Sequence, residues 1–240
     1  MTQRISRRQA LGAFGTVSLG ALLGACGDGD RKVATTDGGS ATVEPTASPA
    51  SSSLVEKLDA AGSCAQTAEQ TEGPYYFDAD AVRSDIREDR DGTVLELALR
   101  VREADGCTPI ENAIVDVWHC DAGGVYSGFA EGEGERFLRG AQATDAEGIA
   151  RFKTIYPGHY QGRTVHIHLK VHLDRRTVLT TQLYFDDEVS DRVFSGGGYP
   201  GAEGRQRNDS DGIYEESLLL ALERSGDSYL GLKNFDVART

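Results

Sequence analysis

The residues of this chain best suited to hold a metal ion are two histidines one residue apart, His166 and His168. Side chains alternate between the two faces of a β-strand, so a His-x-His pair on a strand places both imidazoles on one face, close enough to share a metal. Tyr126 and Tyr160 are candidate partners because each lies near glycines, which permit close backbone approach. Taken alone, the histidine pair is equally compatible with two polar positions on an exposed sheet face.

The segments around these residues are typical of short strands. From Thr93 to Val101 apolar residues alternate with charged ones, and a turn sequence, Ala-Asp-Gly, follows at 104–106. Further segments with strand character are residues 113–118, 149–155, 165–173, 178–185, 216–222 and 229–235. Short strands separated by turn signals about every 8–12 residues indicate a β-sandwich. We therefore predict an all-β fold, an antiparallel β-sandwich with long loops, in which both histidines lie on one strand.

Two segments near the C-terminus are less regular. Residues 187–211 contain a Gly-Gly-Gly run and a Pro-Gly pair, which predicts a long surface loop. The leucines of 215–224 fit neither the helical nor the strand period, so a helix remains an alternative there.

Residues 1–25 have the features of an export signal. The sequence SRRQAL resembles the twin-arginine signal, and the apolar stretch 10–23 is short for a membrane span. Residues 23–26 (LGAC) resemble a bacterial lipobox, in which Cys26 is lipidated and becomes the new N-terminus. We therefore expect an exported lipoprotein of the cell envelope, anchored in the membrane through Cys26 and facing outward from the cytoplasm.

Residues 26–62 are rich in Gly, Ser, Thr, Ala and Asp and poor in aromatics, which predicts a disordered, flexible linker. A short helix over 53–61 is a weaker alternative. The folded part is then 63–240, the size of a single domain. With 25 Lys and Arg against 38 Asp and Glu, the net charge is −13, and this acidic balance excludes a nucleic-acid-binding surface. We expect a small-molecule partner.

Six segments together resemble the intradiol ring-cleavage dioxygenases, the family of protocatechuate 3,4-dioxygenase and catechol 1,2-dioxygenase. They are residues 72–76 (EGPYY), 117–121 (VWHCD), 123–128 (GGVYSG), 156–160 (YPGHY), 163–168 (RTVHIH) and 181–185 (TQLYF). The resemblance implies a β-sandwich that holds one non-haem Fe(III) by two tyrosines and two histidines. Carried over position by position, these ligands are Tyr126, Tyr160, His166 and His168. Two anionic phenolate oxygens favour Fe(III) over Fe(II).

The resemblance also implies a reaction: O₂ cleaves a catechol between its two hydroxylated carbons and gives a muconate-type dicarboxylate that holds both oxygen atoms. Tyr160 matches the tyrosine that leaves the iron when substrate binds and takes a substrate proton. Arg163 matches the substrate-contacting arginine that stabilises negative charge on the ring, a role suited to a permanently charged guanidinium. Gln182 matches a polar residue near the reacting oxygen, and Tyr75 matches a wall of the substrate cavity.

The N-terminal region departs from one branch of the family. Catechol 1,2-dioxygenases carry a helical N-terminal region used for dimerisation, whereas this chain has a signal and a linker there. It therefore resembles a minimal protocatechuate-type subunit or the secreted branch, and a homo-oligomer is compatible with either. A protocatechuate carboxylate would need a cation, for which Arg136 and Arg139 are candidates that no spacing argument distinguishes.

Three cysteines remain after Cys26, namely Cys64, Cys107 and Cys120. They allow three pairings, and the odd count implies one free thiol or an intermolecular bond. We favour Cys64–Cys107, because Cys64 lies at the domain edge and Cys107 follows a turn.

Two other function classes compete with the dioxygenase. A Cu/Zn redox lipoprotein also places His-x-His on a strand of a sandwich, but it needs more histidines than the five present, of which His119, His159 and His172 match no ligand position. A transthyretin-like binding module would use the glycine and tyrosine motifs for packing alone. Iron content and colour separate the three, since only ferric tyrosinate gives a red-brown absorption.

Overall fold

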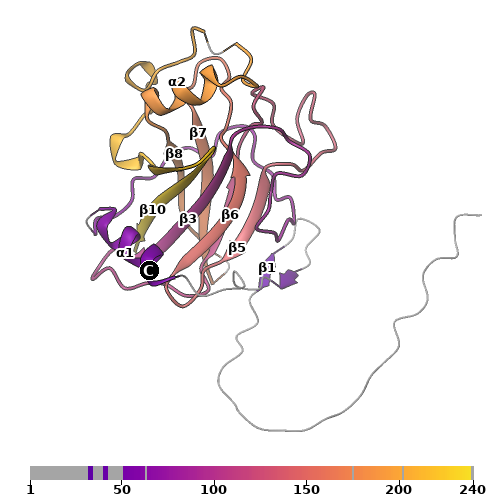
Figure 1. Cartoon of the computed structure of the whole chain (residues 1–240). Helices are drawn as coiled ribbons and strands as arrows, with labels where there is room; N and C mark the ends of the chain where they lie inside the picture. Colours follow the sequence, from indigo (N-terminus) through magenta and orange to yellow (C-terminus); the bar gives the residue numbers. More distant parts are fainter. Residues whose placement is uncertain are drawn as a thin grey trace, which may run out of the picture. The chain divides into compact units, whose positions relative to one another are not determined.

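The computed structural model describes residues 32–34, 40–42, 51–62, 64–174, 176–201 and 203–238 (Figure 1). The predicted signal 1–25, the lipidation site Cys26 and most of the predicted linker lie outside the described residues. Within the described part of the chain, no helix is both long enough and apolar enough to cross a membrane.

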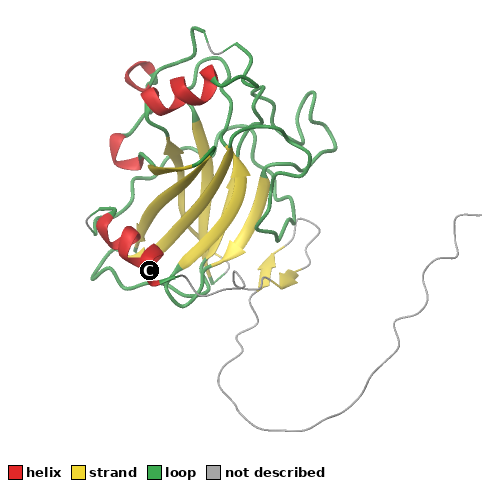
Figure 2. Cartoon of the chain, viewed as in Figure 1, coloured by secondary structure: helices red, strands yellow, loops and turns green. Residues whose placement is uncertain are grey.

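Two four-stranded sheets form the body of the fold (Figure 2). The first sheet has the order β6-β3-β10-β9, with β3 Val94–Glu103, β6 Ile149–Ile155, β9 Ala221–Ser225 and β10 Ser228–Val237. The second has the order β5-β4-β7-β8, with β4 Ile114–Trp118, β5 Arg139–Ala143, β7 His166–Leu173 and β8 Arg176–Tyr184. A separate short pair consists of β1 Lys32–Ala34 and β2 Ser40–Thr42. The predicted all-β sandwich is confirmed.

The first sheet is not wholly antiparallel, because its central strands β3 and β10 run parallel, with Leu97 opposite Gly231. A parallel pair cannot be joined by a tight hairpin and needs a crossover. Here the whole second sheet lies between β3 and β10 in the sequence. Local alternation is the same in both kinds of pair, so it does not reveal strand direction.

The hydrophobic core lies between the two sheets. The strand positions that fill the core therefore determine which residues of the same strands point outward. Leu97 and Leu99 of β3 pack in one buried cluster with Val117 of β4 and Ile167 and Leu169 of β7. Because the strand period is two, the residues between these core positions point to the opposite face of the second sheet. Trp118, His166 and His168 occupy those positions, so the histidine pair lies on the outer face of this sheet.

The region 187–211, predicted as a loop, begins with a helix, α2 Asp187–Ser195. The side chain of Asp186 accepts hydrogen bonds from the amides of Glu188 and Val189 and so caps the helix. Two short 3-10 helices follow, η1 Asn208–Ser210 and η2 Glu216–Leu218. The expected strand 216–222 is therefore shifted: its first three residues form η2, and only its last two belong to β9.

The folded part begins earlier than the expected boundary at residue 63. Residues Ser52–Ala60 form α1, whose Leu58 is fully buried against Ala98 and Leu232 on the outer face of the first sheet. Asp59 pairs with Arg100 at 2.7 Å, which fixes the helix further. The C-terminal end of the region expected to be a flexible linker is thus packed against the sheet. The average composition of 26–62 is polar, and it does not reveal that Leu58 and its neighbours form a local apolar cluster.

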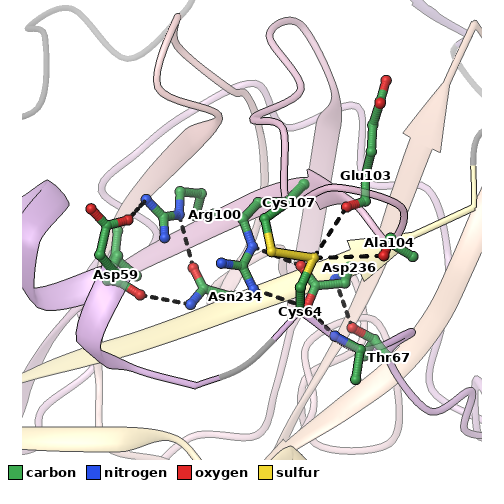
Figure 3. The surroundings of a disulfide bond; sticks show 12 residues. Asp59, Cys64, Thr67, Arg100, Glu103, Ala104, Cys107, Asn234 and Asp236 are labelled. Carbon is green, nitrogen blue, oxygen red and sulfur yellow. Dashed lines mark hydrogen bonds and ion pairs between the residues drawn. A yellow bond between two sulfur atoms is a disulfide. The ribbon is translucent and has the colours of Figure 1, made fainter.

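A disulfide joins Cys64 to Cys107, the pairing favoured from the sequence, and Cys120 is a buried free thiol (Figure 3). The chain after Cys64 is held along β10, where the amide of Ala65 donates to Asp236 at 3.2 Å. Asp236 also forms a buried ion pair with Arg102 at 2.7 Å. The segment then reaches β8, where the Gln70 amide donates to the Thr180 carbonyl at 2.8 Å. This path leads it to the outer face of the second sheet.

Candidate functional site

The histidine pair lies at the start of β7 with its ring nitrogens facing each other. His166 Nε2 and His168 Nε2 are 3.0 Å apart, and the residues are only 2% and 1% exposed. Burial, reinforced by the nearby Arg163 charge, lowers the pKa of His166 to about 3. Burial, followed by the neighbouring His166, likewise lowers the pKa of His168 well below its ordinary value. Both imidazoles are therefore neutral at pH 7, the form that binds metals.

The surroundings of each ring fix its orientation. The Thr164 carbonyl accepts a hydrogen bond from His166 Nδ1 at 2.6 Å, so the proton is on Nδ1 and the Nε2 lone pair is left free. His168 stacks on Trp118, with ring centroids 5.1 Å apart and an interplanar angle of 7°. Gly73 lies against the same ring, and a Cβ at this position, where φ is +73°, would come within 3.1 Å of His168 Cε1. A side chain at 73 would push the imidazole out of place.

Tyr160 reaches the histidines from the loop before β7. Its Oη donates to His166 Nε2 at 3.0 Å. The ring is partly exposed, and burial raises the pKa of the phenol to about 12. Without a cation at this position, Tyr160 therefore keeps its proton at neutral pH.

Tyr126 comes from a separate loop, and its ring centroid lies 5.7 Å from that of Tyr160. Gly124 makes this approach possible, because a Cβ there would meet the His159 carbonyl oxygen at 2.4 Å. Tyr126 is 4% exposed, and its Oη is buried without a well-formed hydrogen bond among the described residues, although the Tyr160 phenol lies beside it. Burial raises the pKa of this phenol well above its ordinary value. The phenol oxygen therefore has a lone pair that could serve a metal ligand set.

The donor set fits a ferric ion. The Tyr160 hydroxyl contacts His166 Nε2, and the Tyr126 ring centroid lies 6.2 Å from that of His168. Phenolate is a hard anionic ligand that favours Fe(III). The part of the chain that the structure describes holds no group of three or more His, Cys, Asp and Glu side chains suited to a metal. A copper or zinc site of the histidine and aspartate type is therefore not assembled there, and the two tyrosines are needed to complete a ligand set.

Two predicted polar residues, from different segments, meet beside this cluster. Arg163 Nη2 donates to Gln182 Oε1 at 2.6 Å, and Gln182 Nε2 donates to the Thr71 carbonyl at 2.9 Å. Arg163 Nη2 also lies 3.4 Å from the Tyr184 hydroxyl. His168 and Gln182 are opposite each other in the β7–β8 ladder, which brings Gln182 to the histidine face.

Tyr75 covers the two tyrosines. Its ring stacks on Tyr126 at 4.4 Å with an interplanar angle of 15° and lies edge-on to Tyr160 at 6.0 Å. Its carbonyl accepts a hydrogen bond from Arg139 Nη2 at 2.8 Å. Arg139 is 1% exposed and also donates to Ser127, so this arginine holds the loops of the site together.

Two of the three remaining histidines, His119 and His172, lie outside the cluster. His119 is fully buried, with Nδ1 2.8 Å from the Cys120 carbonyl and Nε2 2.7 Å from Thr154 Oγ1. His172 is further along β7, where Thr177 Oγ1 contacts its Nδ1 at 3.1 Å. Both have structural partners of their own.

Sequence reasoning missed Asp211, which accepts a hydrogen bond from Arg163 Nε at 2.9 Å, and the roles of Trp118 and Gly73 beside His168. Alternation could have found Trp118, because it occupies the same face as the histidines on the adjacent strand. Asp211 is 48 residues from Arg163 in the sequence, and no local pattern connects the two.

Comparison with known proteins gives matches to dioxygenases. A sequence profile of the family described as "Dioxygenase" matches residues 71–196. The intradiol ring-cleavage dioxygenase from Tetranychus urticae superposes with a TM-score of 0.69 at 32% identity, over 73% of this chain and 95% of that one. The dioxygenase domain of a dioxygenase and carbohydrate-binding protein fusion from Streptomyces sp. SirexAA-E gives a TM-score of 0.59 at 31% identity, over 73% of this chain and 99% of that domain.

Among curated proteins, the chlorocatechol 1,2-dioxygenase of Pseudomonas sp. (strain P51) is 32% identical over 136 residues, which are 48% of this chain and 54% of the relative. The catechol 1,2-dioxygenase 1 of Acinetobacter lwoffii is 29% identical over 224 residues, which are 81% of this chain and 67% of the relative. The chain thus spans about half the length of the first of these relatives, 54%.

Proposed function

The chain belongs to the intradiol ring-cleavage dioxygenase family, and on this basis we propose that it is a non-haem Fe(III) dioxygenase that cleaves a catechol between its two hydroxylated carbons. O₂ is the second substrate, and a muconate-type dicarboxylate is the product. The observation that carries this proposal is the gathering of the His166 and His168 Nε2 atoms, the Tyr160 hydroxyl and the ring of Tyr126 in one buried cluster. These four side chains would hold the iron.

When bound, Fe(III) supplies Lewis-acid activation of a chelating catechol toward O₂. The two tyrosines then have different tasks. Tyr126 is 4% exposed and its ring is stacked on Tyr75, whereas Tyr160 is partly exposed. Tyr160 is therefore the phenol that moves aside for substrate and accepts a substrate proton at its Oη.

Arg163 and Gln182 act on the substrate ring. The guanidinium carries a fixed positive charge beside the histidines and stabilises negative charge that develops on the ring. Gln182 orients the guanidinium through its 2.6 Å hydrogen bond and is itself held by its hydrogen bond to the Thr71 carbonyl. The ring of Tyr75, stacked on Tyr126, would form a wall of the substrate cavity.

The charges around the site favour a catechol without a carboxylate. Two cations were considered for a protocatechuate carboxylate. Arg139 is buried and donates to Ser127 and to the Tyr75 carbonyl, and Arg136 donates to the Ala79 carbonyl at 3.0 Å. Several curated relatives carry the names catechol and chlorocatechol 1,2-dioxygenase, which supports the same substrate class.

Iron analysis and oxygen uptake test this function. We expect about one iron per chain, a red-brown absorption, and O₂ uptake with catechol that exceeds the uptake with protocatechuate or hydroxyquinol. The product should carry the ultraviolet absorption of a conjugated diene dicarboxylate. A colourless protein that binds no iron, or an iron protein that consumes no O₂ with any catechol, would contradict the proposal.

We propose further that the enzyme works in the cell envelope as an exported lipoprotein held by acylated Cys26. The twin-arginine motif supports this, since that route exports folded proteins and would allow iron to be loaded before export. A Cys26→Ala form should leave the membrane fraction while the wild-type chain stays in it. Membrane retention of the Cys26→Ala protein would contradict the anchor.

A further inference from the structure

The guanidinium of Arg163 is held from two directions. Its Nε donates to Asp211 Oδ2 at 2.9 Å, and its Nη2 donates to Gln182 Oε1 at 2.6 Å. Its third nitrogen, Nη1, makes no hydrogen bond to any residue in the described part of the chain. The Asp211 side chain is 2% exposed and that of Arg163 is 18% exposed, so solvent screens this ion pair only weakly.

The same carboxylate oxygen also holds the backbone that leads into β7. Asp211 Oδ2 accepts the Thr164 amide hydrogen at 2.9 Å, and the carbonyl of Thr164 accepts from His166 Nδ1 at 2.6 Å. One oxygen atom thus fixes the side chain of residue 163 and the peptide of residue 164. The position of the Arg163 guanidinium and the ring orientation of His166 therefore both depend on the Asp211 carboxylate.

Asp211 is itself anchored independently of the site. Its Oδ1 accepts the Ile213 amide hydrogen at 3.0 Å. Three residues earlier, Asn208 donates to the Phe185 carbonyl at 2.9 Å, and Arg205 is buried in an ion pair with Asp187 of α2 at 2.6 Å. The segment that carries Asp211 is therefore fastened to the chain that follows β8, and the carboxylate is a rigid reference point for Arg163.

We propose that Asp211 is a positioning residue of the ring-cleavage reaction, which acts through Arg163 by holding the guanidinium beside the histidines and tyrosines. This inference rests on the proposed function. An arginine side chain has several rotatable bonds, and a displacement of about 1 Å in a reacting group can cost about 10²-fold in rate. With Gln182 as its only partner, the guanidinium would be held at one nitrogen, Nη2, and could still rotate about the Nη2–Gln182 hydrogen bond.

The test is a double-mutant cycle in the iron-loaded full chain. Asp211→Asn keeps an oxygen that can accept the Thr164 or Ile213 amide hydrogen but removes the charge that binds Arg163. We expect kcat for catechol to fall about 10- to 100-fold with iron content preserved. The melting temperature should fall, because the change breaks a buried ion pair, but the protein should still unfold cooperatively. In an Arg163→Gln background the same Asp211→Asn change should alter kcat by less than about threefold, because residues that act as a unit are not additive.

Asp191→Asn is the matched control. Asp191 pairs with Arg205 and Arg207 in the neighbouring part of the same network without touching Arg163, so kcat should stay within about threefold. A readout without turnover completes the test: in the metal-free protein, hydrogen exchange at Arg163 Nε, followed by NMR, should be slow in the wild type and in Asp191→Asn and fast in Asp211→Asn.

Equal losses from Asp211→Asn in both backgrounds would overturn the proposal, as would unchanged exchange at Arg163 Nε. Should Asp211→Asn fail to fold, Asp211→Ser carries the same cycle, since its hydroxyl can still accept one of the two amide hydrogens. A wild-type protein that cleaves no catechol would refute the proposed function alone, and the exchange measurement would still decide whether Asp211 immobilises Arg163.

Discussion

Tyr160 Oη donates a 3.0 Å hydrogen bond to His166 Nε2, whereas the buried Oη of Tyr126 makes no such bond to either histidine. The two phenols are thus inequivalent before any substrate arrives. Tyr160 already has a neighbour that can take its hydrogen bond, and its ring is partly exposed, while Tyr126 is fixed beneath Tyr75.

This difference predicts opposite behaviour of two phenylalanine variants. Tyr160→Phe should keep its iron but bind catechol slowly, since general-base assistance is typically worth about 10²–10⁴-fold. Tyr126→Phe should shift the visible absorption and impair every step, because it removes a permanent ligand. Stopped-flow mixing of each variant with catechol measures the effect. If Tyr126→Phe alone slowed chelation while Tyr160→Phe bound normally, the two roles would have to be exchanged.

Substitution of the three histidines of β7 should show which of them bind iron and which does not. His166→Ala and His168→Ala should each lose most of the bound iron, because each removes one of the four proposed ligands. His172→Ala should retain iron, since His172 contacts Thr177 instead. Iron content after purification in the same medium is the measurement. Equal loss in all three variants would show that the strand as a whole, and not the pair, controls metal binding.

Leu58 should contribute to the stability of the domain although it lies in the region expected to be a linker. It is 0% exposed, so Leu58→Ala should lower the free energy of unfolding by about 2–5 kcal/mol. Glu56→Ala, on the exposed side of α1, should stay within about 0.5 kcal/mol. Urea denaturation of both variants checks this. A chain that starts at 51 should likewise be more stable than one that starts at 63.

The disulfide should stabilise the folded domain. Cys64 and Cys107 are 43 residues apart, and closing a loop of that length restricts the unfolded chain by about 4 kcal/mol in the chain-entropy description. The double variant Cys64→Ser, Cys107→Ser should therefore unfold at lower urea concentration.

Cys120 should react with thiol reagents only after unfolding, because it is 1% exposed and burial raises its pKa to about 12. Rapid labelling of Cys120 in the native protein would contradict its buried position.

Acid should destabilise the protein through His119. Burial lowers the pKa of His119 to about 4 from an ordinary value of 6.5. Between these two values the unfolded chain binds a proton that the folded chain does not, so stability falls as the pH drops from about 6.5 toward 4, by about 1.4 kcal/mol per pH unit. Urea titrations of the wild type and His119→Gln between pH 7 and 5 test this. The variant should show the shallower pH dependence, and equal slopes would assign the effect to other groups.

The sequence by itself determined the elements whose signal is local. Alternation defined β3, and the spacing of His166 and His168 placed both rings on one face, because the side-chain period of a strand is two. The four proposed ligands come from two loops and one strand, and the resemblance to a known family identified them before their distances were known. The helix α2 also had a local signal, the capping residue Asp186. The glycines later in 187–211 nevertheless favoured the prediction of a loop for the whole segment.

Tertiary structure alone decided the relationships between distant segments. The parallel pairing of β3 with β10, the docking of Leu58 and the engagement of Arg139 by Ser127 and Tyr75 each depend on which surfaces meet in the folded chain. The contact between Arg163 and Asp211 is of the same kind. An aspartate in a polar loop has the same local sequence whether it is solvated or buried against an arginine, so only the folded chain reveals that this carboxylate holds the cation of the site.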